Sequence, residues 1–472
     1  MVQPNDRPTT LGALRRSGAA TVPVREEIRR NLATRLASGG RAVDGVLGFE
    51  QSVVPQLENA LLAGHDVILL GERGQAKSRI VRSLVGLLDE WAPVVAGSEI
   101  NDDPFRPVSR YARDLVAELG EQTPIAWVHR SDRYGEKLAT PDTSIADLIG
   151  EVDPIKVAEG RYLADELTIH YGLVPRTNRG IFAINELPDL AERIQVGLLN
   201  VLEEQDVQIR GHRVRLPVDV VLVATANPDD YTSRGRIITP LKDRFGAQIR
   251  THYPVDAATE MVVVAQEARP ASTAGVEVVM PAPMAEVVAV LTQLARSSPR
   301  IDQRSGVSVR ASIANHETLV ATALRRALVL GETVAAPRVS DLDALVPSTV
   351  GKIEVEALDD GGEEEIVGQL ARAAVLQVFR ERVPQAQLAA VVAAFDDGLV
   401  VEVGAELAAE HYVGVLASAP ALADAVGPLV GARPTPAEVA SALELVLEGL
   451  HLARRLGKDT GASAGSSTYS SR

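Results

Sequence analysis

Apolar positions in the first half of the chain fall in short runs that alternate with stretches of helical spacing. Each run is short, rich in branched side chains and bounded by turn residues or by a helical stretch. Runs that alternate with helices in this way are typical of buried parallel strands in an α/β sandwich. The runs are DVILL (66–70), IAWVH (125–129), GIFAINEL (180–187) and VDVVLVATAN (218–227).

Beyond residue 255 the strand signals fade and helical spacing takes over. We therefore expect an α/β domain over 25–255, a helical domain over 256–355 and a mainly helical region over 356–457. The acidic start of the last region, EALDDGGEEEIVG, resembles a linker or surface loop, and GLVVEVG (398–404) predicts one β element. Both ends lack periodicity, so residues 1–24 are expected to be flexible and the Gly/Ser-rich tail, 458–472, disordered.

Composition narrows the class of protein. The 472 residues suit about two to four domains, and 46% apolar with only 3% aromatic residues predicts a largely aliphatic core. The chain has no cysteine, which excludes disulfides and thiolate zinc sites and suits a reducing cytoplasm. The first residues show no apolar signal-peptide core, and no uncharged run approaches the roughly 18 residues of a membrane span. We therefore expect a cytoplasmic protein.

The net charge of −15 argues against non-specific coating of nucleic acid by the whole chain. One local basic segment stands out, DVQIRGHRVRLP (206–217), which reads as a β-hairpin. Two interpretations stay open for it: contact with nucleic acid or with an acidic protein segment, or an ordinary solvated hairpin. Its basic residues are Arg210, His212, Arg213 and Arg215.

The sequence GERGQAKS (71–78) nearly matches the phosphate-binding loop G-x-x-x-x-G-K-[ST], and it lies between an apolar run and a helical stretch. Backbone N–H groups of such a turn cradle phosphate oxygens, while Lys77 would reach the β- and γ-phosphates and Ser78 would bind Mg²⁺. Ala76 replaces the last glycine, which we expect to be tolerated if its φ is negative. The alternative is a plain strand–turn–helix. The candidate loop consists of Gly71, Glu72, Arg73, Gly74, Gln75, Ala76, Lys77 and Ser78.

Three polar segments follow in order, each at a predicted strand or helix end. Asn185 and Glu186 end one apolar run, where the glutamate could polarise a water and the amide could hold a metal-bound water. Asn227 ends the next run and could touch the γ-phosphate or the attacking water. Arg244, in LKDRFG, could stabilise phosphoryl-transfer charge from a neighbouring subunit. Taken singly, these residues also suit a capped strand end, an Asn-Pro turn and a surface ion pair.

Taken together and in this order, the motifs resemble the AAA+ ATPases of the magnesium-chelatase and MoxR-like branch. The resemblance covers roughly residues 45 to 350. Its most specific part runs from Gly180 to Phe245. The segments that carry it are GERGQAKS, TSIADLIGEVDP, GLVPRTNRGIFAINELPDL, NVLEEQDVQIRGHRVRLPVDVVLVATANP and LKDRFG.

The resemblance implies an AAA+ P-loop nucleotide-binding domain, a parallel sheet sandwiched by helices, followed by a helical lid and assembled as a ring, with a hexamer expected. It assigns Gly71, Gly74, Lys77 and Ser78 to Walker A, and it assigns Walker B to Asn185 and Glu186. It also makes Asn227 the first sensor, Arg244 the finger acting in trans and Arg310 the second sensor at a helix start. Asn185 departs from the usual aspartate, and the missing carboxylate could weaken Mg²⁺ binding and slow hydrolysis.

The function that the resemblance implies is binding and hydrolysis of Mg-ATP to remodel or metallate a partner protein, which in this branch commonly carries a von Willebrand A domain. One alternative is the motor subunit of a true magnesium chelatase in tetrapyrrole biosynthesis. Another, favoured by Asn185, is an ATP-binding scaffold with little turnover. A DNA helicase or transcription activator is disfavoured because the chain is acidic and shows neither a GAFTGA loop nor a helix-turn-helix signature.

Overall fold

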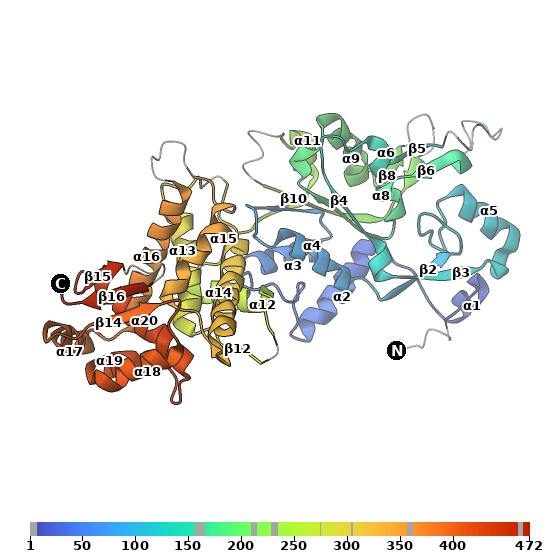
Figure 1. Ribbon diagram of the computed structural model, residues 1–472. Coiled ribbons are helices and arrows are strands. Elements are labelled where there is room, and N and C mark those ends of the chain that lie inside the picture. Colours follow the sequence, from blue (N-terminus) through green and yellow to red (C-terminus); the bar gives the residue numbers. More distant parts are fainter. Residues whose placement is uncertain are drawn as a thin grey trace. The chain divides into compact units, whose positions relative to one another are not determined.

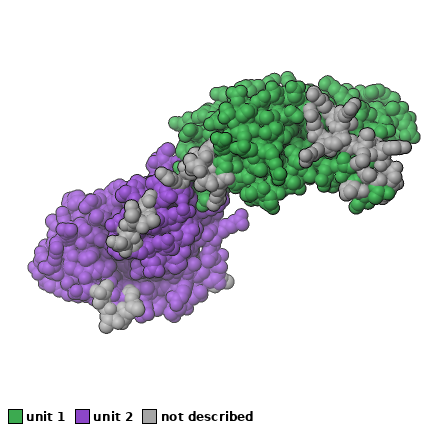
Figure 2. Space-filling model, turned by 90° about the horizontal axis from the view of Figure 1, so that it is seen from above, with its two compact units in different colours: residues 1–252 green, residues 253–472 purple. Residues whose placement is uncertain are grey.

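The chain divides into two compact units, Met1–His252 and Tyr253–Arg472 (Figure 2). The computed structural model describes residues 7–153, 155, 158, 166–208, 215–227, 235–273, 275–303, 305–355, 362–460 and 466–472.

The first unit is built on a five-stranded sheet in the order β11-β1-β10-β7-β4, and every neighbouring pair is parallel. Strands β1, β7 and β10 come from three of the four apolar runs, and these predictions are confirmed. They are buried on both faces apart from Asn185, as parallel strands between helices must be. The five strands are β1 Val67–Leu70, β4 Tyr134–Leu138, β7 Gly180–Asn185, β10 Val220–Ala226 and β11 Ala247–Arg250.

Helices cover both faces of this sheet (Figure 1). Alternate strand residues point to opposite faces, so Val67 and Leu69 pack in one hydrophobic cluster and Ile68 in the other. The first cluster includes α2 Val24–Ala37, α3 Val53–Ala63, α4 Lys77–Ser83 and the 3₁₀ turn η2 Leu84–Leu87. The second includes α8 Leu173–Arg176, the turn η6 Leu187–Asp189, α9 Glu192–Glu203 and α11 Thr239–Arg244. This three-layer arrangement confirms the predicted α/β class.

Short ribbons and helices complete the unit. Residues 125–129 form a strand as predicted, but not in the parallel sheet. They pair antiparallel with β2, and only Ile125 is fully buried, because a two-stranded ribbon outside the sandwich has less cover than the main sheet. The ribbons are β2 Trp91–Val95 with β3 Ile125–His129, β5 Gly150–Val152 with β6 Ile169–Tyr171, and β8 Asp206–Gln208 with β9 Arg215–Pro217. The remaining elements are α1 Leu11–Arg16, α5 Arg110–Leu119, α6 Ile145–Leu148, η3 Gly120–Gln122, η4 Arg130–Arg133 and η5 Glu166–Thr168.

The structure bears on two further predictions for this unit, the hairpin over 206–217 and the flexible N-terminus over 1–24. The hairpin over 206–217 is present as β8 and β9, but Arg210, His212 and Arg213 lie outside the described residues. The flexible N-terminus predicted over 1–24 does not agree with the structure from residue 7 onward. Thr10 caps α1, bridges to Pro124, and is followed by the buried Leu11 and Leu14, so this segment gains enough apolar burial to be held.

The second unit is mainly helical, with a three-stranded antiparallel sheet of order β14-β16-β15 and one short strand pair, β12 with β13. Its helices are α12 Ala257–Glu267, α13 Ala282–Ser297, α14 Val309–Leu330, α15 Val346–Val350, α16 Glu363–Arg382, α17 Gln385–Asp396, α18 Ala409–Ser418, α19 Pro420–Val426 and α20 Pro436–Leu452, with turns η7 Val339–Leu345 and η8 Gly427–Leu429. Its strands are β12 Glu277–Val278, β13 Val334–Ala335, β14 Val401–Gly404, β15 Gly457–Thr460 and β16 Ser466–Ser470.

The division expected at residue 355 falls inside one hydrophobic core. A single cluster joins α13 and α14 to α16 and to Leu445 of α20, so the segments on either side of 355 share their buried surface. The acidic stretch expected as a linker instead opens α16, with Glu363, Glu364 and Glu365 in its first turn. Acidic side chains there are favourable because they face the positive end of the helix dipole.

The tail expected to be disordered forms strands. Residues 457–460 and 466–470 pair antiparallel with each other, and β16 also pairs with β14, the β element predicted at 398–404. Tyr469 is buried, and its hydroxyl donates to Glu448 of α20. The Gly/Ser-rich composition of the tail predicts disorder. The segment is ordered instead because Tyr469 is buried and β16 pairs with β14. Within the described residues no helix alone is long and apolar enough to cross a membrane, although the bent pair Ala409–Ser418 and Pro420–Leu429 passes by length and composition.

Candidate nucleotide-binding site

The loop 71–78 connects β1 to α4, as the sequence predicts, and its two glycines serve different purposes. The Gly71 N–H donates to the Ala226 carbonyl at 3.1 Å, which continues the pairing of β1 with β10. A Cβ at Gly71 would lie 1.9 Å from Thr251 Oγ1, so no other residue fits there without displacement. Gly74 has φ 76°, in the left-handed region that favours glycine.

Side chains of the loop itself hold its backbone in shape. The Lys77 ammonium is buried and donates to the carbonyls of Gly71 and, at 2.9 Å, of Glu72. Gln75 is also buried, and its Oε1 accepts from the Glu72 N–H at 3.1 Å and from the Thr251 hydroxyl at 2.7 Å. The loop is therefore a preformed turn with a cation inside it, whereas Arg73 and Ser78 are exposed.

Ala76 does not have the negative φ on which its expected tolerance depended. Its φ is 54° and its ψ 14°, so it is left-handed, and α4 begins at the next residue. For a residue with a Cβ this conformation costs about 1–2 kcal/mol. Position 76 therefore keeps the backbone conformation that suits glycine although the glycine itself is absent.

The end of β7 brings Asn185 and Glu186 against β10 through Thr225, which is buried. The Thr225 hydroxyl donates to Asn185 Oδ1 at 3.3 Å and accepts from the Glu186 N–H at 3.1 Å. Glu186 is itself left-handed, with φ 56°. Such backbone strain is concentrated at functional sites because the surrounding structure has to enforce it.

On its other side Asn185 contacts Glu136 of the edge strand β4. The Asn185 amide nitrogen donates to Glu136 Oε1 at 2.6 Å. Arg82 of α4 donates to both oxygens of the same carboxylate, at 2.8 and 2.9 Å, and the Tyr134 hydroxyl donates at 3.0 Å. The hydrogen bonds from Arg82 are the largest cause that lowers the pKa of Glu136 below its ordinary value, so this group stays a carboxylate.

Asn227 follows directly on β10 and is buried. Because β1, β10 and β7 are neighbours and parallel, the loop 71–78, Asn227 and the pair Asn185–Glu186 all meet at the carboxyl ends of three adjacent strands. This is the edge at which open α/β sheets bind their ligands.

Neither of the two predicted arginines takes part in the hydrogen bonds described above. Arg244 ends α11, where its Nε donates to Glu203 at 2.7 Å and its Nη1 to the Pro240 carbonyl at 2.9 Å. Arg310 belongs to the second unit, is exposed, and stands in the first turn of α14, which begins after the cap Ser308. It therefore begins a helix as expected, and its role stays a prediction.

Sequence reasoning missed three residues that shape the site: Glu136, Thr225 and Thr251. Their contacts with the site depend on strands that are far apart in the chain and neighbours in the sheet. The signal for Thr225 was present, since a lone hydroxyl interrupts the otherwise apolar run VVLVATA. No such signal marked Glu136, because the short strand YGEKL has no apolar run.

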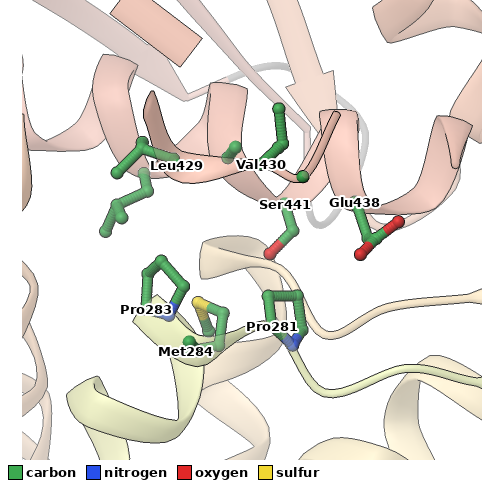
Figure 3. Close-up of a pocket in the computed structure, with 11 residues that line it drawn as sticks. Pro281, Pro283, Met284, Leu429, Val430, Glu438 and Ser441 are labelled. Atoms are coloured by element: carbon green, nitrogen blue, oxygen red, sulfur yellow. The ribbon is translucent and has the colours of Figure 1, made fainter. Parts of the chain in front are cut away.

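A hollow in the second unit carries no comparable chemistry. Figure 3 shows Pro281, Pro283 and Met284 facing residues of α20 across a hollow of about 210 Å³. Its polar side chains are engaged within the protein: Glu438 accepts from the Thr435 N–H at 2.8 Å, and Ser441 donates to the Pro337 carbonyl at 2.6 Å. Among the described residues, no group of three or more His, Asp or Glu side chains could hold a metal ion.

The parallel sheet, the glycine-containing loop after β1 and the polar residues ending β7 and β10 define a P-loop nucleotide-binding protein. A family model described as Sigma-54 interaction domain matches residues 159–241. The magnesium-chelatase subunit ChlI of Oryza sativa subsp. indica is 28% identical over 56% of this chain and 66% of its own length. The 38 kDa magnesium-chelatase subunit of Cereibacter sphaeroides is 29% identical over 46% of this chain and 61% of its own.

Among solved structures, a model of the complex between subunits BchI and BchD of magnesium chelatase is 20% identical, covers 68% of this chain and 97% of its own, and has a TM-score of 0.34. The chain is therefore similar to magnesium-chelatase subunits and, over residues 159–241, to the Sigma-54 interaction domain. It spans less than two thirds of the length of these curated relatives.

Proposed function

We propose that the first unit binds Mg-ATP at the loop 71–78 and hydrolyses it. The observation that carries the proposal is the meeting of this loop with Asn185, Glu186 and Asn227 at one edge of three adjacent parallel strands. The residues present suit a nucleotide phosphate. The loop has no room for a Cβ at Gly71, it bends at Gly74, and it encloses the ammonium of Lys77.

Within this proposal each side chain has a definite task. Lys77 exchanges its bonds to the loop carbonyls for phosphate oxygens, while the backbone N–H groups of the loop bind the remaining oxygens. Glu186 orients and polarises the attacking water, and Asn227 positions that water against the terminal phosphate. The Ser78 hydroxyl and the Asn185 amide oxygen would hold Mg²⁺, directly or through water, and the ion would neutralise phosphate charge.

Assembly and partner are further parts of the proposal. A ring, with a hexamer expected, would place Arg244 of one subunit against the nucleotide of the next, and Arg310 would act as the second sensor. The similarity to magnesium-chelatase subunits supports a chelatase-like remodeller. A MoxR-like role, a cytoplasmic location and a separate partner protein with a von Willebrand A domain complete the proposal, and they rest on the sequence motifs alone. The motor subunit of a true magnesium chelatase is compatible with the same similarity.

ATP turnover by the purified full-length chain tests hydrolysis. Glu186→Gln should lower turnover by about 10²-fold or more while nucleotide affinity is kept, since only the water-activating carboxylate is lost. Lys77→Ala should abolish binding. Glu118→Gln, at an exposed position on α5, is the matched control and should match the wild type. Wild-type turnover no higher than that of Glu186→Gln would refute hydrolysis.

The same measurements separate the second candidate, an ATP-binding scaffold, which the uncharged Asn185 favours. A wild-type protein that binds ATP tightly yet turns over no faster than Glu186→Gln would be such a scaffold. A pull-down with ATP-loaded Glu186→Gln tests the partner, because slowed hydrolysis should trap it. Recovery of a von Willebrand A protein supports the remodeller, whereas porphyrin-dependent Mg²⁺ insertion by the recovered complex supports the chelatase.

A further inference from the structure

Asn185, beside the proposed nucleotide site, donates a short hydrogen bond to Glu136. It joins the last residue of β7 to the neighbouring edge strand β4 at 2.6 Å. The sheet order β1-β10-β7-β4 places Asn185 between two different neighbours. Toward β1 and its loop it meets Thr225 of β10, and away from them it meets Glu136.

These neighbours determine which way the amide of Asn185 points. An ionised carboxylate only accepts hydrogen bonds, so the NH₂ group must face Glu136 and the carbonyl oxygen must face the other way. The Thr225 hydroxyl, which donates to Asn185 Oδ1, completes the same arrangement. Asn185 therefore presents its acceptor oxygen toward the side of the sheet that carries the loop 71–78.

Glu136 is in turn fixed by α4. Arg82 binds its carboxylate through two hydrogen bonds, at 2.8 and 2.9 Å, and α4 begins at the end of the loop 71–78. A bidentate arginine–carboxylate pair is directional, so it limits the rotation of the carboxylate. Loop helix, edge strand and Asn185 thus form one continuous set of contacts.

We propose that Glu136 is a positioning residue of the nucleotide site, and that Glu136 and Asn185 together take the place of the aspartate usual at position 185. In this arrangement the neutral amide supplies the acceptor oxygen, and the negative charge lies one strand further out, balanced by Arg82. The inference rests on the proposed binding of Mg-nucleotide by the loop 71–78.

A positioning role for Glu136 predicts that Asn185→Asp weakens Mg²⁺-dependent nucleotide binding. If Asn185 were only a defect, restoring the aspartate would improve Mg²⁺-dependent binding. With Glu136 in place, the change instead brings two carboxylates to the position of a 2.6 Å hydrogen bond, which is strongly unfavourable. Adding Glu136→Gln removes the clash, because the new amide can donate to the carboxylate introduced at position 185.

The test uses the full-length wild-type chain, Asn185→Asp, Glu136→Gln and the double variant. The dissociation constant of a fluorescent ADP is measured in EDTA and in Mg²⁺, and their ratio is the Mg²⁺ enhancement. Each single variant should lose about 10-fold of this enhancement, as expected when a supporting partner of a metal site is removed. The double variant should recover to within about 3-fold of the wild type, a strong departure from additivity.

Thermal unfolding gives a second readout that needs no nucleotide. The two tryptophans of the chain, Trp91 and Trp127, lie in the β2–β3 ribbon, so tryptophan fluorescence follows the first unit. The unfolding temperature should fall in Asn185→Asp and recover in the double variant.

The chain contains a chemically matched control. Asp89 accepts two hydrogen bonds from Arg30 and one from the Asn31 amide at 2.9 Å, which repeats the arginine–carboxylate–asparagine arrangement outside the loop and strand ends of the site. Asn31→Asp should lower the unfolding temperature in the same way, and adding Asp89→Asn should restore it in part, because the Asn31 amide also donates to the Leu87 carbonyl at 3.0 Å and an aspartate cannot. Neither should change the Mg²⁺ enhancement.

One result would refute the positioning role of Glu136, and another would refute nucleotide binding itself. If Asn185→Asp alone raised the enhancement, or if the effects of the two substitutions simply added, Glu136 would have no positioning role although nucleotide binding stood. If the wild-type chain bound no ADP in either buffer, the proposed function would be refuted, and with it the role of the pair.

Discussion

Ala76 offers a direct test of how the loop 71–78 is built. Its backbone is left-handed, with φ 54° and ψ 14°, at the position where the phosphate-binding motif has glycine. Ala76→Gly removes the Cβ that makes this conformation costly and leaves the turn otherwise unchanged. We therefore expect the substitution to stabilise the first unit, contrary to the usual effect of placing glycine in a folded chain.

The magnitude follows from three contributions. Relief of the left-handed conformation is worth about 1–2 kcal/mol. Against it stands the Ala76 methyl group, half-buried against the cluster around Val67, which contributes about 0.4 kcal/mol, half the value of a fully buried methylene. Glycine also gives the unfolded chain about 0.4–1 kcal/mol more conformational freedom, which lowers the stability of the folded state. The net stabilisation is about 0.5 kcal/mol.

A matched control makes this small difference measurable. Ala33 is exposed inside the right-handed helix α2, and Ala33→Gly should cost about 0.5–1 kcal/mol. The gain in unfolded-chain freedom is common to both substitutions, so it cancels when the two are compared. Ala76→Gly should therefore be more stable than Ala33→Gly by about 1 kcal/mol or more, which is about 2–4 °C in a unit of this size.

The assay is thermal unfolding of the full-length chain followed by tryptophan fluorescence, which reports on the first unit. Nucleotide affinity is measured alongside and should change little, because the backbone of residue 76 already has the conformation glycine would take. If Ala76→Gly lowered the unfolding temperature as much as Ala33→Gly does, residue 76 would not be left-handed in solution.

Three other substitutions test separate parts of the structure. Gly71→Ala should destabilise the first unit by about 1–3 kcal/mol in urea unfolding, because its Cβ would meet Thr251. Arg244→Ala should lower ATP turnover by about 10³-fold, and mixing it with Lys77→Ala should restore turnover if Arg244 acts in trans; no recovery would contradict that role. Tyr469→Ala should cost the second unit about 3–5 kcal/mol by circular dichroism, whereas a change near zero would contradict the burial of β16.

The sequence predicted most of the central sheet, since the strands at 66–70, 180–187 and 218–227 are buried on both faces and therefore read as continuous apolar runs. The strand at 125–129 has the same composition but lies in an antiparallel ribbon. Composition cannot distinguish these cases, because pairing depends on a partner, β2, that lies elsewhere in the chain. Strands β4 and β11 escaped notice because edge strands carry mixed polarity.

The sequence predicted candidate residues for the site but not their contacts. The order of the motifs predicted the loop 71–78, Asn185, Glu186 and Asn227, and the parallel strands place these residues at one edge of the sheet, while their roles stay predictions. The left-handed backbone of Ala76 was not predictable, because alanine gives no local sign of it. The partner of Asn185 was not predictable either, because Glu136 reaches it only through the lateral pairing of β4 with β7.

The three-stranded sheet of the second unit has a consequence for the order of folding. Strands β14 and β15 do not pair with each other; both pair with β16, which is the last of the three along the chain. β14 ends at Gly404 and β16 begins at Ser466, so at about 5–20 residues per second the ribosome needs several seconds between them. Until then β14 exposes an unpaired edge, and the second unit can close only after residues 466–470 have been made.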